Sequence, residues 1–281
     1  MDAAEHTWSP LLKPLLPADD EVLLALATLD LSGPRIQQLS DTLSPDEIDR
    51  ADRFATEELH NRWVACRGLL RELLGALLGA APERLRFLYG SHGKPLVDPD
   101  SVPAQQEPRL TFNVSHSRDH ALFALARGRE VGVDLESIRE RNSDGVADRF
   151  FTPDESAALR ALDDESERRR AFFSLWSAKE AFIKATGLGL SQSLASFGFE
   201  LARVSVPGAR ERAPGLVPVQ LRWHRDDPRA SESWRVHALA PNDEFAAALV
   251  TAGNPRTLSL RVWNAARALP LPETNTGATI L

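Results

Sequence analysis

The chain has 281 residues, 43% of them hydrophobic, which allows one large or two small globular domains with a buried core. Its 40 acidic residues outnumber its 33 basic residues and give a net charge of −7, which argues against broad binding of nucleic acid or anionic membranes. A single cysteine, Cys66, excludes an internal disulfide and a cysteine-based zinc site. No signal peptide and no apolar run long enough to cross a bilayer is apparent, so we expect a cytoplasmic protein.

We expect two halves, the first being an α+β lobe over residues 21–129. Residues 1–20 are interpreted as an irregular arm, because their prolines interrupt any helix. An apolar run at residues 22–31 indicates a buried strand, and Ser-Gly-Pro at residues 32–34 indicates a turn after it.

Two helices are predicted next in the first lobe. The sequence SPDE at residues 44–47 is typical of a helix start, with a capping serine, a proline and a carboxylate. Over residues 57–79 apolar residues recur at helical spacing, which predicts one long amphipathic helix with Cys66 as an inert buried thiol. The arginines of these two helices serve either solubility or a phosphate-rich ligand: Arg50, Arg53, Arg62, Arg67 and Arg71.

The two halves are expected to meet near residue 129. The segments ALFALA at 121–126 and VGVDLE at 131–136 are interpreted as a β-hairpin across this join. A second α+β lobe is expected over residues 130–252. Beyond it the periodicity fades, which predicts a loosely attached tail over residues 253–281.

The second lobe begins with helical patterns. The cap sequence TPDE predicts a helix near residues 153–162, and the charged run at 163–170 is interpreted as a solvated link. The segment FFSLWSAKEAFIKATGLGL at 172–190 has apolar helical spacing. Short strands are expected after it, in the segments FGFEL, VQLRW, SWRVHAL and FAAALVT.

Two carboxylates lie close together in the segment VGVDLE. Alternate side chains of a strand point to opposite faces, so the apolar residues enter the core while Asp134 and Glu136 emerge together. Adjacent carboxylates raise each other's pKa unless a cation lies between them, and hard oxygen ligands suit Mg²⁺. A solvent-facing strand edge is the alternative interpretation.

The segment at residues 172–190 carries Ser177, Glu180 and Lys184 on one stripe of the predicted helix. Glu180 precedes Lys184 by one turn, which is also the arrangement of an ordinary surface ion pair. Bulky apolar side chains crowd the rest of the segment and leave only a narrow polar strip. Such a strip can line a cleft.

Two further segments offer donors for an anion. Ser115 and His116 in FNVSHS point apart as sequence neighbours, which excludes a serine-hydrolase dyad and favours phosphate contact. The turn GSHGKP at residues 90–95 presents Lys94 and lacks the length and the following helix of a P-loop. For the histidine, a satisfied structural role is the alternative.

Four ordered motifs, GKP at 93–95, SHS at 115–117, DLE at 134–136 and WSAKEAFIK at 176–184, together resemble the 4′-phosphopantetheinyl transferases of the surfactin-synthetase-activating (Sfp) type. The resemblance implies an α+β fold of two similar α/β lobes related by a pseudo-twofold axis, with coenzyme A between them. It also implies a Mg²⁺-dependent enzyme. Such an enzyme transfers the 4′-phosphopantetheine arm of coenzyme A to a serine hydroxyl of an apo acyl, peptidyl or aryl carrier protein and releases 3′,5′-ADP.

The resemblance also implies roles for individual residues. Asp134, Glu136 and Glu180 would bind Mg²⁺, Lys184 would neutralise phosphate charge, and Glu180 would act as the base for the carrier serine. Contacts to the nucleotide part of coenzyme A would come from Arg50, Arg62, Lys94, Ser115 and His116. Glu47 departs from the pattern, because a close relative has lysine there.

Two other functions would use the same residues. One is a non-catalytic module that binds coenzyme A or a carrier protein, which the presence of all three expected metal ligands disfavours. The other is a Mg²⁺-dependent pyrophosphate hydrolase. We expect a monomer that binds neither nucleic acid nor membrane, and the sequence does not select one carrier protein.

Overall fold

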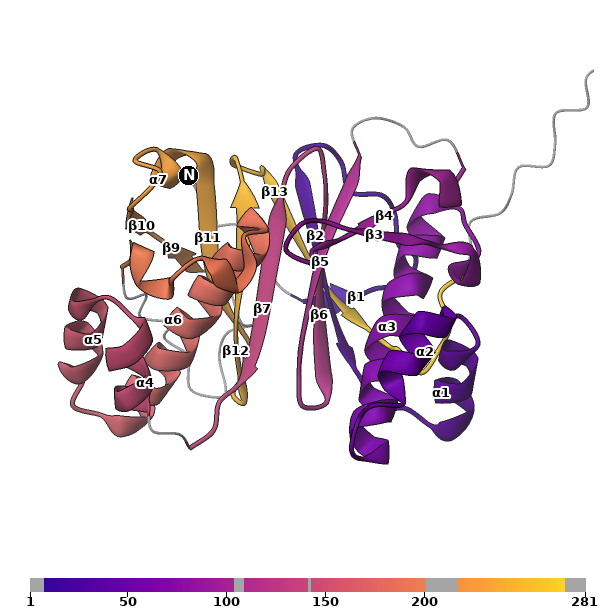
Figure 1. The fold of residues 1–281 in the computed structure, drawn as a ribbon, viewed down its shortest axis with the longest axis horizontal. Coiled ribbons are helices and arrows are strands. Elements are labelled where there is room, and N and C mark those ends of the chain that lie inside the picture. Colours follow the sequence, from indigo (N-terminus) through magenta and orange to yellow (C-terminus); the bar gives the residue numbers. More distant parts are fainter. Residues whose placement is uncertain (1–7, 104–108, 141–142, 201–216, 271–281) are drawn as a thin grey trace, which may run out of the picture.

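The computed structural model describes residues 8–103, 109–140, 143–200 and 217–270. Within these residues the two halves repeat one order of elements: a strand, three helices, short strands, and an antiparallel strand pair (Figure 1). The last of the three helices has 22 residues in each half. This repeat confirms the expected α+β fold of two similar lobes.

The elements of the first half end at Arg127. They are β1 (Ser9–Pro10), β2 (Glu21–Thr28), α1 (Gly33–Ser40), α2 (Pro45–Ala51), α3 (Glu57–Leu78), η1 (Pro82–Arg84), β3 (Phe87–Tyr89), β4 (Pro95–Val97), η2 (Pro99–Ser101), β5 (Leu110–Ser117) and β6 (His120–Arg127).

The second half begins with β7 and is followed by one more strand, β13. The elements are β7 (Val131–Ser137), α4 (Ser143–Phe150), α5 (Pro153–Arg160), α6 (Glu165–Thr186), η3 (Gly189–Ser191), η4 (Leu194–Ser196), β8 (Phe197–Phe199), β9 (Val217–Val219), β10 (Leu221–His224), α7 (Ala230–Ser233), β11 (Trp234–Asn242), β12 (Phe245–Ala252) and β13 (Thr257–Trp263).

Two larger sheets form the centre of the molecule. The first has the order β1-β13-β2-β6-β5 and the second has the order β7-β12-β11-β9. Buried apolar side chains of both sheets, such as Leu24, Leu122, Val133 and Leu249, form one shared inner core. One outer core lies between the first sheet and the helices α1, α2 and α3, and another lies between the second sheet and α4, α5 and α6 (Figure 1). The molecule therefore has four layers, helix, sheet, sheet and helix.

The helix starts predicted from the sequence are confirmed, and their caps explain them. Both Ser44 before α2 and Thr152 before α5 form reciprocal capping boxes with the glutamate three residues later. α3 covers almost all of residues 57–79 and α6 ends at Gly187, which adopts a left-handed conformation with a φ of 70°.

Two local predictions are wrong because helices occupy residues where a solvated link and a turn were expected. The charged run at 163–170 is mostly the first part of α6, since the side chain of Asp164 accepts a hydrogen bond from the backbone of Glu167 and caps the helix. The predicted turn at 32–34 contains the start of α1, with proline in its first turn.

The predicted hairpin of residues 121–126 and 131–136 is also wrong. β6 pairs with β5 and β2 in the first sheet, whereas β7 pairs with β12 in the second sheet. The short connection between Arg127 and Val131 therefore carries the chain from one sheet to the other.

β13 corrects the prediction of a loosely attached tail. It lies between β1 and β2, parallel to both, in register from Thr257 opposite Glu21 to Trp263 opposite Ala27. Ala265, which follows β13, is fully buried. Its backbone oxygen accepts a hydrogen bond from Arg35 of α1. Residues 271–281 of the predicted tail lie outside the described residues.

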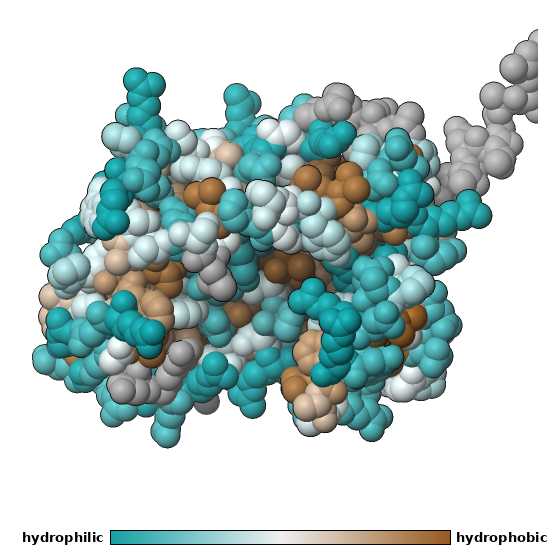
Figure 2. Space-filling model, viewed as in Figure 1, coloured by the Kyte–Doolittle hydropathy of each residue, from teal (hydrophilic) through white to brown (hydrophobic). Residues whose placement is uncertain are grey.

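The predicted N-terminal arm is irregular over residues 11–20 and contributes β1 to the first sheet. Residues 1–7 lie outside the described part of the chain. Figure 2 shows that one broad face of the molecule is mostly hydrophilic, with apolar residues exposed in small separate patches. Within the described residues, no helix is both long and apolar enough to cross a membrane.

Candidate active site

The two sheets approach each other where β5, the last strand of the first sheet, lies beside β7, the first strand of the second. Side chains of β5 at every second residue bridge the two strands. Asn113 Oδ1 accepts from Val133 N at 2.8 Å, Ser115 Oγ donates to Asp134 Oδ1 at 2.9 Å, and Ser117 Oγ accepts from Ser137 N at 3.0 Å. We call these six residues the β5–β7 seam. The motif FNVSHS thus joins the lobes as well as presenting polar atoms.

Lys184 of α6 lies directly over this seam. Its Nζ donates to Asp134 Oδ1 at 2.7 Å and to Ser115 Oγ at 2.9 Å. The Lys184 side chain is 30% exposed, whereas the Asp134 side chain is 6% exposed. Because an ammonium group has three N–H donors, one donor of Lys184 has no acceptor among the described residues.

The carboxylate of Asp134 lies close enough to act electrostatically on two glutamates, Glu136 and Glu180. Burial, together with the negative charge of Asp134, raises the pKa of both Glu136 and Glu180 above 4.5. A hydrogen bond from Trp176 and the charge of Lys184 act in the opposite direction on Glu136. The mutual repulsion of these carboxylates is the electrostatic pattern that a cation would relieve.

The residues fit a divalent cation in their chemistry. Asp134 Oδ2 is buried without a hydrogen-bond partner among the described residues, and an unpaired buried carboxylate oxygen is costly. The side chains of Asp134, Glu136 and Glu180 are not placed to coordinate one ion together, since the described residues hold no cluster of three such groups that could bind a metal ion. At present the ammonium of Lys184 provides the positive charge beside Asp134.

Gly132 explains how α6 comes so close to β7. A Cβ atom at this position would overlap the carbonyl oxygen of Ala181 and the backbone of Ala185, with the Cα of Ala185 only 2.8 Å away. The helix backbone therefore rests directly on the strand. This close approach places Glu180 and Lys184 beside Asp134.

Comparisons with known proteins show the family to which this chain belongs. Residues 32–127 match the family model for the N-terminal part of 4′-phosphopantetheinyl transferases, and residues 130–250 match that for the 4′-phosphopantetheinyl transferase superfamily. The chain is 36% identical over 250 residues to the 4′-phosphopantetheinyl transferase HetI of Nostoc sp. strain PCC 7120, a match that covers 89% of this chain and 95% of that protein. The chain belongs to the 4′-phosphopantetheinyl transferase superfamily.

Two Bacillus relatives support this assignment. The 4′-phosphopantetheinyl transferase psf-1 of Bacillus pumilus is 36% identical over 188 residues, which cover 66% of this chain and 75% of that protein. A 4′-phosphopantetheinyl transferase of Bacillus subtilis is 31% identical over 218 residues, covering 76% and 89%. The protein is therefore an enzyme that transfers phosphopantetheine from coenzyme A to a carrier protein, which confirms the expected activity.

Two of the nucleotide-binding residues predicted for this transferase lie near the seam. His116 follows Ser115 on β5; the residue keeps part of its surface exposed, while protein atoms crowd around its ring. Burial by the surrounding protein and the positive charges of Lys184 and Arg50 lower the pKa of His116. Arg50 is also exposed and lies 5.9 Å from the ring of Trp63.

Arg62, by contrast, is already bound within the transferase. Its guanidinium donates to both carboxylate oxygens of Asp30, at 2.7 and 3.0 Å, and contacts Glu58 as well. The hydrogen bond from Arg62 lowers the pKa of Asp30, although partial burial opposes it. Arg62 is thus held by two acidic residues of its own lobe, Asp30 and Glu58.

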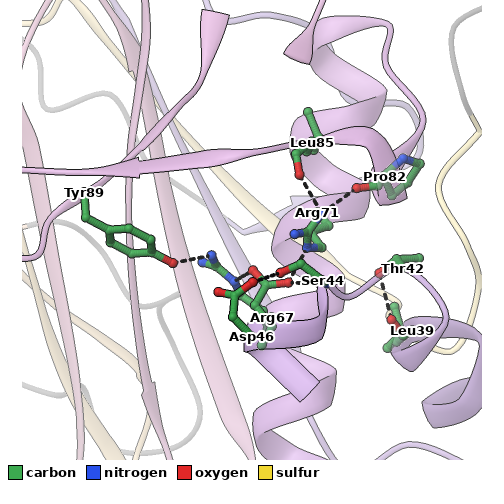
Figure 3. Close-up of polar contacts among 10 residues, drawn as sticks. Leu39, Thr42, Ser44, Asp46, Arg67, Arg71, Pro82, Leu85 and Tyr89 are labelled. Atoms are coloured by element: carbon green, nitrogen blue, oxygen red, sulfur yellow. Dashed lines mark hydrogen bonds and ion pairs between the residues drawn. The ribbon is translucent and has the colours of Figure 1, made fainter. Parts of the chain in front are cut away.

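The remaining arginines of α3 form a buried network rather than a basic surface. Arg67 and Arg71 both donate to the carboxylate of Glu47, which is 3% exposed (Figure 3). Arg71 also donates to two backbone oxygens, of Pro82 and Leu85, and Arg67 reaches Tyr89 Oη. Burial opposes ionisation of Glu47, but the two arginines outweigh it and lower its pKa. Glu47 therefore has a structural role in this transferase.

Lys179 is a residue whose role the sequence analysis missed. It lies in the motif WSAKEAFIK but is fully buried, and its Nζ contacts Glu155 at 2.9 Å and the backbone oxygens of Leu194 and Phe197 at 2.8 Å. Burial lowers its pKa to about 8. Its position in the sequence, outside the polar stripe of Glu180 and Lys184, is the signal that could have distinguished its role from theirs.

Proposed function

We propose that the β5–β7 seam and the adjoining face of α6 form the active site in which this transferase moves the 4′-phosphopantetheine arm to a carrier serine. The observation that supports this most directly is the contact of Lys184 with Asp134. It leaves one donor of the ammonium and one oxygen of the carboxylate without partners among the described residues. These two groups would engage the pyrophosphate and a cation.

In the proposed reaction, the serine Oγ of the carrier attacks the β-phosphorus of coenzyme A. A new oxygen–phosphorus bond forms while the bond from that phosphorus to 3′,5′-ADP breaks, and 3′,5′-ADP leaves with the electron pair. Glu180 accepts the serine proton, since its carboxylate lies close to both Asp134 and Lys184. Lys184 stabilises the negative charge that develops on the phosphates.

Mg²⁺ is part of the proposal, with Asp134, Glu136 and Glu180 as the residues that would hold it. When bound, the ion would supply positive charge to the pyrophosphate oxygens. The support is the unpartnered Oδ2 of Asp134 and the raised pKa values of the two glutamates. Glu180 would then act on the serine proton either directly or through a water molecule.

For the nucleotide part of coenzyme A, we propose contacts from Arg50, Ser115 and His116. Their support is that the positive charges of Arg50 and Lys184 both act on His116, so the two cations and the imidazole share one region. Arg62 would take part through the N–H groups that its contacts with Asp30 and Glu58 leave over.

We further propose that the enzyme acts as a monomer in the cytoplasm and is of the Sfp type. The support for the Sfp type is the set of four ordered motifs. Acyl, peptidyl and aryl carrier proteins are all candidates as acceptors.

Incubation of the purified protein with coenzyme A, Mg²⁺ and a panel of apo carriers tests the proposal by intact mass spectrometry. We expect at least one carrier to gain one phosphopantetheine arm, and the gain to disappear when EDTA replaces Mg²⁺. Binding of coenzyme A with no mass gain on any carrier would instead indicate a binding module. Release of phosphopantetheine without a carrier would indicate a pyrophosphate hydrolase.

A further inference from the structure

Lys94 has no N–H donor left for a phosphate. Its Nζ donates to Glu130 Oε2 at 2.6 Å, to Val131 O at 3.1 Å and to Ala185 O at 3.1 Å. These three bonds use all three donors of an ammonium group. The Lys94 side chain is only 14% exposed, so its charge is mostly enclosed. This differs from the role of a nucleotide contact that the GKP motif implies.

Two of the three acceptors of Lys94, the backbone oxygens of Val131 and Ala185, lie on the two elements that carry the proposed catalytic groups. Ala185 is in the last turn of α6, where backbone carbonyls lack partners within the helix and the helix dipole favours a cation. Val131 is the first residue of β7 and precedes Asp134 by three positions. One side chain from the first lobe thus binds the end of α6 and the start of β7 together.

The turn that carries Lys94 also packs against the second lobe. Gly90 and Lys94 are bonded through Gly90 N and Lys94 O at 2.9 Å, which closes a tight turn between β3 and β4. Carbon atoms of Lys94 and His92 lie 3.7 and 3.4 Å from the positions that a Cβ would take at Gly187 and Gly189. The β3–β4 turn therefore rests on the chain immediately after α6.

We propose that Lys94 is a positioning residue, which fixes the C-terminal end of α6 against β7 and so sets the distance of Lys184 and Glu180 from Asp134. This inference rests on the proposed active site. The ammonium of Lys94 itself does not contact coenzyme A.

The variant Lys94→Met removes the charge and keeps a side chain of similar length. We expect its kcat to fall about ten- to a hundredfold, because small misplacement of catalytic groups is costly, whereas its Kd for coenzyme A, measured by calorimetry without a carrier, changes by less than about threefold. Hydrogen exchange of the backbone amides of residues 131–133 and 183–187 should accelerate. Lys94→Arg, which keeps a donor of the same charge, should restore part of kcat and of the protection, and Lys13→Met, at an exposed lysine, should match the parent protein throughout.

The inference is overturned if Lys94→Met raises the Kd for coenzyme A about tenfold or more while kcat at saturating coenzyme A stays at the parent value, as loss of a nucleotide contact predicts. Unchanged amide exchange in Lys94→Met would also overturn it. If that variant does not fold, Glu130→Gln serves in its place, since it weakens one of the three bonds at a half-exposed residue and should show the same changes at smaller size. The exchange measurement needs no carrier or turnover, so it remains decisive even if the parent protein transfers nothing.

Discussion

The chain contains few lysines, and the hydrogen bonds of three of them indicate their roles. The four lysines among the 33 basic residues are Lys13, Lys94, Lys179 and Lys184. Both Lys94 and Lys179 have three oxygen acceptors within the protein. Lys184 has two. A compact ammonium with one donor to spare suits a substrate phosphate, whereas the saturated ones suit structural positions.

Lys184→Ala should therefore lower turnover more than it lowers affinity for coenzyme A. We expect kcat to fall about a hundredfold, since the charge acts on the transition state, with a much smaller change in Kd. Steady-state kinetics on an apo carrier and calorimetry with coenzyme A check this. Lys13→Ala is the matched control, and equal activity of the two variants would contradict the role given to Lys184.

Glu180→Gln should abolish transfer and alter the pH dependence of stability. The pKa of Glu180 is raised in the fold, so its contribution to stability is present below its ordinary value of 4.5 and is lost as pH rises through the raised pKa. In EDTA, the Tm of the variant should equal that of the parent near about pH 4 and exceed it near about pH 7. Mg²⁺ should raise the Tm of the parent at neutral pH and narrow this difference.

Thermal unfolding at several pH values, with and without Mg²⁺, measures the effect. Glu244→Gln, at an exposed glutamate, is the control and should show no such dependence. If Glu180→Gln is less stable than the parent at neutral pH in EDTA, then burial and the charge of Asp134 do not destabilise the ionised form of Glu180, and the prediction is wrong.

Among the elements, those with local signals were predictable and those with distant partners were not. The capping sequences before α2 and α5 and the apolar period of α3 and α6 lie within a few residues, and all four helices are confirmed. β6 pairs with β5, its neighbour in sequence, on one edge and with β2, about a hundred residues earlier in the chain, on the other, so neither edge is left for β7. The β-hairpin prediction across the join failed for this reason.

The candidate site shows the same division. Strand alternation and helical spacing predicted that Asp134 and Glu136 share one face and that Glu180 and Lys184 share another. No local pattern tells whether an arginine or lysine already has a carboxylate partner from another element. The buried pairs of Arg71 with Glu47 and of Lys179 with Glu155 were therefore missed.

The close packing of α6 on β7 gives a prediction at the level of these elements. Gly132→Ala should push the helix away from the strand and lower the free energy of unfolding by about 1–3 kcal/mol, the usual cost of overpacking. Transfer activity should fall as well, because Lys184 moves away from Asp134. Urea unfolding and kcat measure the two effects.

Gly33→Ala is the matched control for this substitution. A Cβ at Gly33 would meet no atom within 4 Å, so the variant should keep the stability and activity of the parent. If Gly132→Ala and Gly33→Ala behave alike, the close packing of α6 on β7 does not require a glycine at position 132.

At the scale of the whole molecule, two connections cross between the sheets: one between β6 and β7, and the other between β12 and β13. The second crossing returns the chain to the first sheet, where Leu260 of β13 enters the inner core shared by both lobes. The lobes are thus joined by sequence at two places as well as by the β5–β7 seam.

Leu260→Ala should destabilise the whole protein in one transition, by about 2–5 kcal/mol, because it leaves a cavity between the sheets. Val262→Ala, two residues later on the same strand, is the control, since Val262 is 46% exposed and its truncation should cost little. Chemical unfolding followed by fluorescence and by circular dichroism checks both values. Equal stability of the two variants would show that β13 is attached as loosely as the sequence suggested.

The position of β13 also has a consequence for synthesis on the ribosome. A chain that emerges from its N-terminus first makes β2 and all of α3 long before the strand that separates β1 from β2 exists. The backbone groups along one edge of β2 then stay unpaired until the complete second lobe has left the exit tunnel. The nascent N-terminal lobe should therefore need protection by chaperones, and stalled chains ending before residue 257 should be captured by them and digested by proteases more readily than the released protein.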